Sequence, residues 1–216
     1  MMDGMTRQAR KVGDVSVEAG RGPGQLPWYE FASQFVEGKS VLDAGCGLGE
    51  GLKILQRTAR EAMGQDLDPR LARSDIMVKP LQEIPSKSFD VVTSIDVVEH
   101  VEQDENFVAE LCRIARDAVF VTTPNWTITR CQWPYHLREY TPKQLESLLK
   151  PYGEVQLFKG NSSGSVVFPV RHPDAYHFGN RLRAAPFTAF MTRCVNRLLP
   201  SDSRIHGHNA ALVRLG

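Results

Sequence analysis

Short apolar runs alternate with longer periodic stretches along the first 125 residues, and this alternation predicts strands separated by helices. Strands are predicted at 40–46, 61–67, 75–79, 89–95 and 117–122. Helices are predicted at 26–36, 50–60 and 106–115. This order favours an α/β, Rossmann-like, doubly wound and mostly parallel sheet. Ligands of such sheets bind at the carboxyl ends of the strands.

The pattern is weaker in the second half of the chain. Thr141 followed by Pro142 predicts the start of a helix that runs to Lys150. Strands are predicted at 154–159 and 209–215. The residues Phe187, Phe190, Met191, Cys194, Val195 and Leu198 form an apolar stripe at helical spacing. We expect that helix to pack on the core or to act as a lid, rather than to lie on a membrane.

The domain organisation follows from these segments. Residues 1–24 are polar and glycine-rich, and we expect a mobile N-terminal arm there. Residues 25–216 are expected to form a single domain, in which 124–140 and 173–200 cover the acceptor as a lid. The segment between the second and fourth strands is short, so a helix there is expected to shrink to a turn.

Composition narrows the function classes. The formal net charge is +1, so there is no electrostatic case for a nucleic-acid partner. Four cysteines lie far apart without a C-x-x-C pair, which argues against a disulfide framework and favours a reducing cytoplasm. His206 and His208 lack a cysteine or acid cluster nearby, so no metal site is predicted. The oligomeric state stays open.

Alternating glycines at Gly45, Gly47 and Gly49 come directly after a predicted strand and before a helix. Such glycines let a ligand approach main-chain atoms that a Cβ would block. An acid about twenty residues further on, here Asp66, commonly binds the hydroxyls of a ribose. A dinucleotide site needs another glycine where Glu50 stands, and that carboxylate would face the pyrophosphate. The pattern favours a cofactor without phosphate, with a purely structural glycine turn as the alternative.

Three segments, VLDAGCGLGEG, GQDLDPR and SFDVVTSIDVVEHV, resemble in their order and spacing the class I S-adenosylmethionine-dependent methyltransferases. They are most similar to bacterial small-molecule enzymes of the ubiquinone-methyltransferase-like kind. The resemblance covers residues 41–152. It implies S-adenosylmethionine as cofactor, S-adenosylhomocysteine as product, and a seven-stranded sheet whose last strand, at 209–215, is antiparallel.

The resemblance also implies roles for residues at the strand ends. Asp43, Gly45 and Gly47 would hold the methionine part of the cofactor, and Cys46 would line the turn. Asp66 would bind the ribose, with Leu67 packed on the adenine.

Two further positions come from the same comparison of motifs. Ile95 and Asp96 would lie near the methionine and the reacting methyl group. The family often has an aspartate that holds the adenine amino group, but residues 78–85 contain none. Gln82 or a backbone carbonyl is expected to substitute.

The acceptor side depends on residues 133–142, which resemble His-x-x-Glu-[Tyr/Phe]-Thr stretches of many family members. His136 is the candidate general base, because histidine titrates near neutral pH. Alternatively, His136 and Glu139 only pin this loop. A structural role is favoured for Glu99 and His100. The N-terminal helix, through Trp28 and Tyr29, either closes over the cofactor or packs as core.

The expected activity is S-adenosylmethionine-dependent methyl transfer to a small organic acceptor. A hydroxyl oxygen of a sugar, glycan precursor or secondary metabolite is favoured. Two other functions stay open: a non-catalytic S-adenosylmethionine-binding regulatory protein, and an NAD-dependent oxidoreductase with a modified glycine turn.

Overall fold

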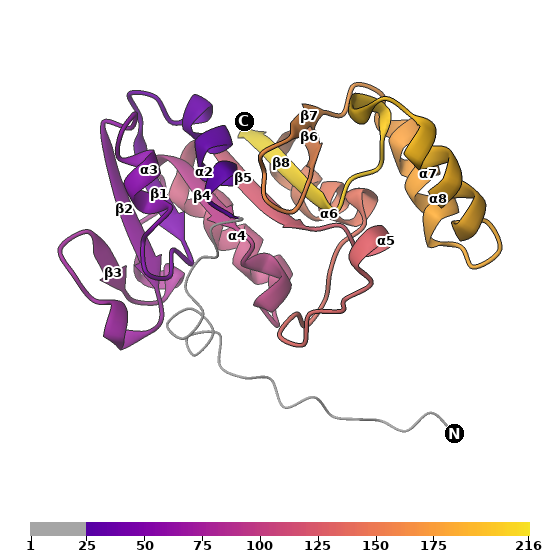
Figure 1. Cartoon of the computed structure of the whole chain (residues 1–216). Coiled ribbons are helices and arrows are strands. Elements are labelled where there is room, and N and C mark those ends of the chain that lie inside the picture. The colour runs from indigo at the N-terminus through magenta and orange to yellow at the C-terminus, as the bar shows by residue number, and fades with distance from the viewer. Residues whose placement is uncertain (1–24) are drawn as a thin grey trace, which may run out of the picture.

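The computed structural model describes residues 25–216, so the expected arm at 1–24 lies outside the described residues. The described residues form one eight-stranded sheet in the order β3-β2-β1-β4-β5-β8-β6-β7 (Figure 1). The strands are β1 (Ser40–Ala44), β2 (Glu61–Asp66), β3 (Ile76–Val78), β4 (Phe89–Ile95), β5 (Ala115–Pro124), β6 (Gly153–Gly160), β7 (Val167–Pro169) and β8 (His208–Leu215).

Strand directions confirm the predicted fold class. β1 to β5 run parallel, whereas β8 is antiparallel to both of its neighbours, β5 and β6. The expected count of seven strands is one short, because the three-residue β7 pairs with the end of β6. β7 contains a proline and has no clear alternation, so its sequence carried little strand signal.

Helices cover both faces of the sheet (Figure 1). One face carries α2 (Leu26–Ala32), the 3₁₀ turn η1 (Ser33–Phe35) and α3 (Leu52–Leu55); the other carries α4 (Asp104–Ile114) and α6 (Pro142–Leu149). Neighbouring strand residues alternate between the two cores: Val41 packs on the α2 side and Leu42 on the α4 side.

Three local expectations can be compared with the observed helices and turns. The helix predicted at 50–60 is shorter, because the amides of Arg57 and Thr58 bond three residues back and the chain leaves α3 in tighter turns. The start of α6 is confirmed, with Thr141 as N-cap in a capping box with Gln144. Between β2 and β4, apart from β3, the chain forms only the short 3₁₀ turns η2 (Pro69–Leu71) and η3 (Leu81–Glu83), as expected.

The C-terminal helices correct one expectation. α7 (Pro173–Ala184) and α8 (Ala189–Leu198) lie side by side beyond the end of the sheet opposite β3 (Figure 1). The expectation that the apolar stripe packs on the core is wrong, because α8 has no buried residue. Phe187 and Leu198 are 97% and 87% exposed. Both faces of the sheet are already covered, so α8 finds no core to join. α7 itself was missed, because its sequence has no continuous apolar stripe.

Among the helices that the structure describes, none combines the length and the apolar composition needed to span a bilayer.

Candidate active site

The glycine turn after β1 is shaped by three residues with positive φ, Gly45 (+73°), Gly47 (+54°) and Gly49 (+73°). A Cβ on Gly45 would lie 2.7 Å from the Val97 side chain, so both conformation and space require glycine there. The amides of Gly45 and Cys46 donate to the Gln65 carbonyl at 2.8 and 3.0 Å. The turn is therefore fixed to β2, and its glycines lack the side chains that would keep a ligand away from the backbone.

Asp66 ends β2 and holds the same turn from the other side. Its carboxylate accepts hydrogen bonds from the amides of Gly47 (3.0 Å), Leu67 (2.7 Å) and Asp68 (3.2 Å). The side chain of Leu67, in contrast, is 63% exposed beside this carboxylate. The hydrogen-bond-accepting carboxylate of Asp66 and the exposed apolar side chain of Leu67 are thus neighbours. This arrangement suits a ribose joined to a flat base.

Asp43 lies deeper, at the end of β1. Its fully buried carboxylate accepts from the Tyr29 hydroxyl at 3.1 Å and from the Thr93 hydroxyl at 2.9 Å. The Tyr29 ring fills the space where a Cβ on Gly51 would stand. α2 is thereby attached to the strand end and to the start of α3, and both Trp28 and Tyr29 are fully buried.

Asp96 follows β4 in the left-handed conformation, with φ of +51°. Its buried carboxylate accepts from Thr122 Oγ1 (2.6 Å), Gln25 Nε2 (2.9 Å) and His208 Nε2 (3.1 Å). Burial opposes ionisation, but the neighbouring His208 ring and these hydrogen bonds outweigh it and hold the pKa of Asp96 well below its usual range. Gln25 and His208 were missed by sequence reasoning. Only the pairing of His208 with Pro124 brings the start of β8 to this edge.

The other predicted cofactor residues occupy different surroundings. Cys46 and Ile95 are fully buried, and the Cys46 sulfur packs where a Cβ on Gly64 would stand. Gln82, the expected substitute for the adenine contact, is exposed on η3. The structure therefore gathers the acids and glycines at the carboxyl ends of β1, β2 and β4, with Gln82 outside that buried group.

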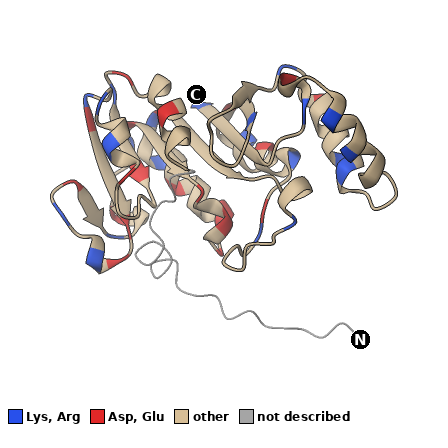
Figure 2. Ribbon diagram, in the orientation of Figure 1, with Lys and Arg blue, Asp and Glu red and all other residues tan. Residues whose placement is uncertain are grey.

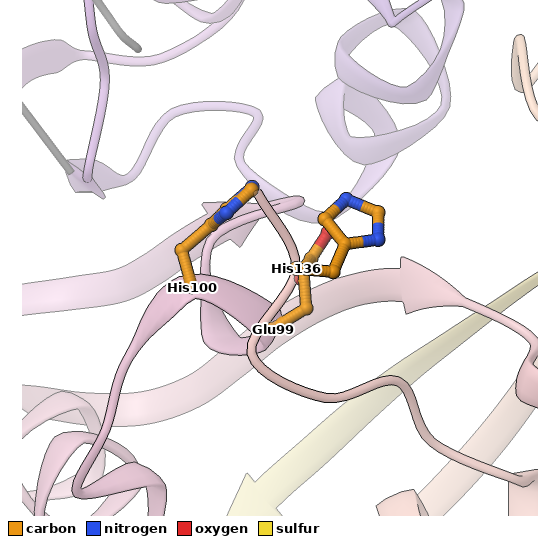
Figure 3. A group of neighbouring side chains, drawn as sticks. All are labelled: Glu99, His100 and His136. Atoms are coloured by element: carbon orange, nitrogen blue, oxygen red, sulfur yellow. The ribbon is translucent and has the colours of Figure 1, made fainter. Parts of the chain in front are cut away.

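A second group of side chains forms beside these strand ends. Glu99 and His100 belong to η4 (Val98–His100), and His136 belongs to the loop at 133–140. One ligand atom of each lies within 4.8 Å of the others, and the two imidazole centroids are 4.9 Å apart (Figure 3). Glu99–His100 and His136 belong to motifs that lie more than 30 residues apart in the sequence. Their positions after the neighbouring strands β4 and β5 were the signal that could have joined them.

The loop at 133–140 is held by buried and half-buried contacts. His136 Nδ1 lies 2.7 Å from Glu139 Oε1, and the Tyr140 hydroxyl donates to Asp104 at 2.6 Å. Burial opposes ionisation of Glu139, but hydrogen bonds from His136, Thr129 and the Cys131 amide hold its pKa below the usual range. This geometry is compatible with a pinned loop and with a histidine oriented for proton transfer.

Comparisons with known proteins agree with this geometry. A methyltransferase domain family matches residues 42–121, which include the glycine turn, Asp66 and Asp96. A probable S-adenosylmethionine-dependent methyltransferase of Mycolicibacterium smegmatis is 34% identical over 175 residues, or 72% of this chain and 66% of that protein. The chain spans less than two thirds of the length of its mycobacterial relatives.

Two further similarities are more distant. A ubiquinone biosynthesis O-methyltransferase of Paracidovorax citrulli is 29% identical over 125 residues, covering 48% of this chain and 50% of that protein. The crystal structure of a SAM-dependent methyltransferase from Archaeoglobus fulgidus has a TM-score of 0.60 at 17% identity, covering 89% and 92% of the two chains. That structural similarity shows the shared fold.

The Asp96–His208 pair makes a prediction about stability. His208→Ala leaves a buried carboxylate without its ring partner, so the free energy of unfolding at neutral pH should fall by about 3 kcal/mol. Urea denaturation measures it. Lys39→Ala, which removes one side of the exposed Lys39–Asp117 pair, serves as the control and should change stability little.

The pH dependence follows from the lowered pKa of Asp96. Its stabilising contribution is complete above the unfolded carboxyl pKa of about 4 and is lost as the pH falls through the folded value. The deficit of the His208→Ala variant should therefore shrink in acid. A deficit that stays constant from neutral pH to acid would contradict the pairing.

Proposed function

We propose that this chain, a member of the class I S-adenosylmethionine-dependent methyltransferases, transfers the methyl group of its cofactor to a hydroxyl oxygen of a small organic acceptor. S-adenosylmethionine is the cofactor, and S-adenosylhomocysteine is the product. The acceptor class that we favour is a sugar, a glycan precursor or a secondary metabolite.

One observation carries the cofactor assignment: the glycine turn with positive φ stands against the buried carboxylate of Asp66. Asp43 and Asp96 add two more carboxylates at the ends of the adjacent strands. Carboxylates suit the hydroxyls of a ribose and the positive ammonium and sulfonium groups of S-adenosylmethionine. They do not suit the pyrophosphate of a dinucleotide.

The choice of an oxygen acceptor rests on His136. Its Nδ1 is engaged by Glu139, so in the neutral ring Nε2 can accept a proton from a hydroxyl. The acceptor oxygen then forms a bond to the methyl carbon as the carbon–sulfur bond breaks, and the sulfur keeps that electron pair. Because the sulfonium is already activated, the remaining task of the protein is to align the acceptor and exclude water.

We also propose that 124–140 and 173–200 border the acceptor as parts of the single domain at 25–216. The side chain of Asn180 in α7 accepts from Asn125 at 3.0 Å and from Thr127 at 2.8 Å, and all three are buried. This contact attaches α7 to the segment that follows β5. We further propose that the protein works in a reducing cytoplasm, because its four cysteines lie far apart in the sequence without a C-x-x-C pair.

The cofactor assignment predicts the effect of Asp66→Ala. Loss of a charged acceptor for the ribose should raise the Kd of S-adenosylhomocysteine by about tenfold to a hundredfold. Calorimetric titration measures this, with NAD as a parallel ligand that should not bind. Glu61→Ala, at the opposite and exposed end of β2, is the matched control. Equal affinity in the Asp66 and Glu61 variants would remove Asp66 from the site.

The assignment of His136 as general base predicts an effect on turnover and none on cofactor affinity. His136→Ala should lower kcat by about a hundredfold or more while the Kd of S-adenosylhomocysteine stays unchanged. Formation of S-adenosylhomocysteine in a screen of sugars, glycan precursors and phenolic metabolites identifies the acceptor and then measures the rate. His172→Ala, at an exposed histidine, should behave as wild type. Full activity of the His136 variant would leave it as a residue that only pins the loop, and binding without turnover on any acceptor would favour a regulatory protein.

A further inference from the structure

Glu99, His100 and His136 are the described residues of ligand type that come close enough to share one metal ion. They reach the same place from two segments, η4 and the 133–140 loop, which run side by side (Figure 3). Glu99 is fully buried, and the two histidines are half-buried. One carboxylate and two imidazoles form a donor set that commonly binds divalent transition metals.

The hydrogen bonds of the two imidazole rings indicate which nitrogen of each ring carries the proton. His100 Nδ1 lies 3.0 Å from the Tyr135 carbonyl, which can only accept, so Nδ1 carries the proton. His136 Nδ1 lies 2.7 Å from Glu139, whose other oxygen accepts from the Cys131 amide. Nδ1 of His136 is therefore also a donor. In the neutral form of each ring Nε2 is then the nitrogen without a proton, which is the tautomer of histidines that bind metal through that atom.

Backbone contacts hold the two segments in register. The Glu99 carbonyl accepts from the amides of Leu137 at 2.9 Å and Arg138 at 3.3 Å. The guanidinium of Arg138 in turn donates to the Glu102 carbonyl at 2.7 Å. The three side chains are thus placed by main-chain bonds on both sides, which reduces the ordering that an ion would have to impose.

We propose that Glu99, His100 and His136 bind one divalent transition-metal ion through a carboxylate oxygen and two Nε2 atoms. Three protein ligands leave coordination positions open, and those positions fit oxygen atoms of the acceptor. This departs from the expectation of no metal that the sequence supported. The favoured acceptor then carries a second oxygen next to the methylated hydroxyl, so that both can coordinate.

The site deepens the proposed function, on which its role in the reaction rests. Coordination lowers the pKa of the acceptor hydroxyl, which releases its proton to solvent. The acceptor oxygen would then form the bond to the methyl carbon as the carbon–sulfur bond breaks, with the electron pair going to sulfur, while Glu99, His100 and His136 would hold the ion that supplies the Lewis-acid activation. In this arrangement the ion takes over the activating role, and His136 contributes as its ligand.

Metal binding can be measured without any acceptor. The untagged protein, freed of metal by chelation, is titrated with Co²⁺ followed by its visible absorption, and with Zn²⁺ by calorimetry. We expect one ion per chain, with Kd raised at least tenfold in Glu99→Gln and His136→Ala and unchanged in His172→Ala. Glu139→Gln alters a side chain that accepts from the Thr129 hydroxyl and the Cys131 amide as well as from His136, and it should weaken binding by about tenfold to a hundredfold.

The outcomes separate this proposal from the assigned activity. No one-to-one ion binding in the wild-type protein, or wild-type affinity in both Glu99→Gln and His136→Ala, overturns the metal site. Titration of the same samples with S-adenosylhomocysteine tests the cofactor site independently. If S-adenosylhomocysteine binds and no metal ion does, the proposed cofactor site stands and the proposed metal site is wrong. Circular dichroism and thermal unfolding check that Glu99→Gln, a conservative change, keeps the fold.

An independent observation concerns the exposed face of α8. Phe187, Phe190, Met191, Val195 and Leu198 are all more than half exposed and lie on one side of the helix. Contiguous apolar surface of this kind marks an interaction site rather than ordinary surface variation.

The charge around this face indicates the partner. Residues 181–204 contain five arginines and one acid, Asp202, in a chain whose formal net charge is only +1 (Figure 2). Burial and the neighbouring Arg193, Arg130 and Arg197 lower the pKa of Arg183. An anionic surface would offset the repulsion among these cations better than a neutral surface. An apolar stripe flanked by arginines is typical of helices that lie in the interface of an anionic bilayer.

We infer that α8 and the turn before it dock on an anionic lipid surface. The wild-type protein should sediment with vesicles of phosphatidylcholine and phosphatidylglycerol, less so at high salt, and much less with phosphatidylcholine alone. The double variant Phe190→Ser, Leu198→Ser should lose at least tenfold in vesicle affinity. Val166→Ser, which alters an exposed apolar residue outside α8, should bind as wild type.

Two results would overturn the proposal that α8 docks on a lipid surface. One is a wild-type protein that stays in solution with every vesicle composition. The other is a dimer, seen by light scattering without lipid, that the double variant dissociates; a second copy of the chain would then cover α8.

Discussion

The site depends on the contact between Asp66 and the glycine turn. Parallel pairing of β1 and β2 brings both strand ends to one edge, and the Asp66 carboxylate then accepts the amide of Gly47. Positive φ at Gly45, Gly47 and Gly49 lets the chain turn sharply at positions that carry no side chain. A fixed strand end and glycines without Cβ atoms are thereby combined, which is the condition for a ligand to approach the main chain closely.

Asp96 connects this group of strand ends to β5 and β8. Its carboxylate joins Gln25 before α2, Thr122 on β5 and His208 on β8, so segments far apart in sequence meet at one buried charge. Burial offsets part of what these hydrogen bonds contribute to net stability, because the carboxylate loses its hydration. Its more specific effect here is geometric: it fixes the start of the antiparallel β8 against the ends of the parallel strands.

Local signals explain what the sequence could predict. The glycines at 45–49, the acid at 66 and the N-cap Thr141 act within a few residues of themselves, and their strands and helix were predicted correctly. The meeting of Asp96 with His208, and of Glu99 with His136, depends on the register of β8 and on the path of a loop. Neither is written in a short window of sequence. The exposure of α8 also follows from a global fact, namely that other helices already cover the sheet.

The predicted cofactor residues and the candidate general base lie in different parts of the chain. The matched methyltransferase segment ends at residue 121, after the glycine turn, Asp66 and Asp96 have all appeared. His136, the Asn125–Asn180 contact and the arginine-rich helices lie beyond it. Residues that hold a shared cofactor can stay constant while the segments that meet the acceptor vary, because loops on a rigid sheet change at little cost to the core. We therefore propose that the acceptor is selected mainly by segments beyond residue 121, together with the donor set that η4 and the 133–140 loop place beside the strand ends.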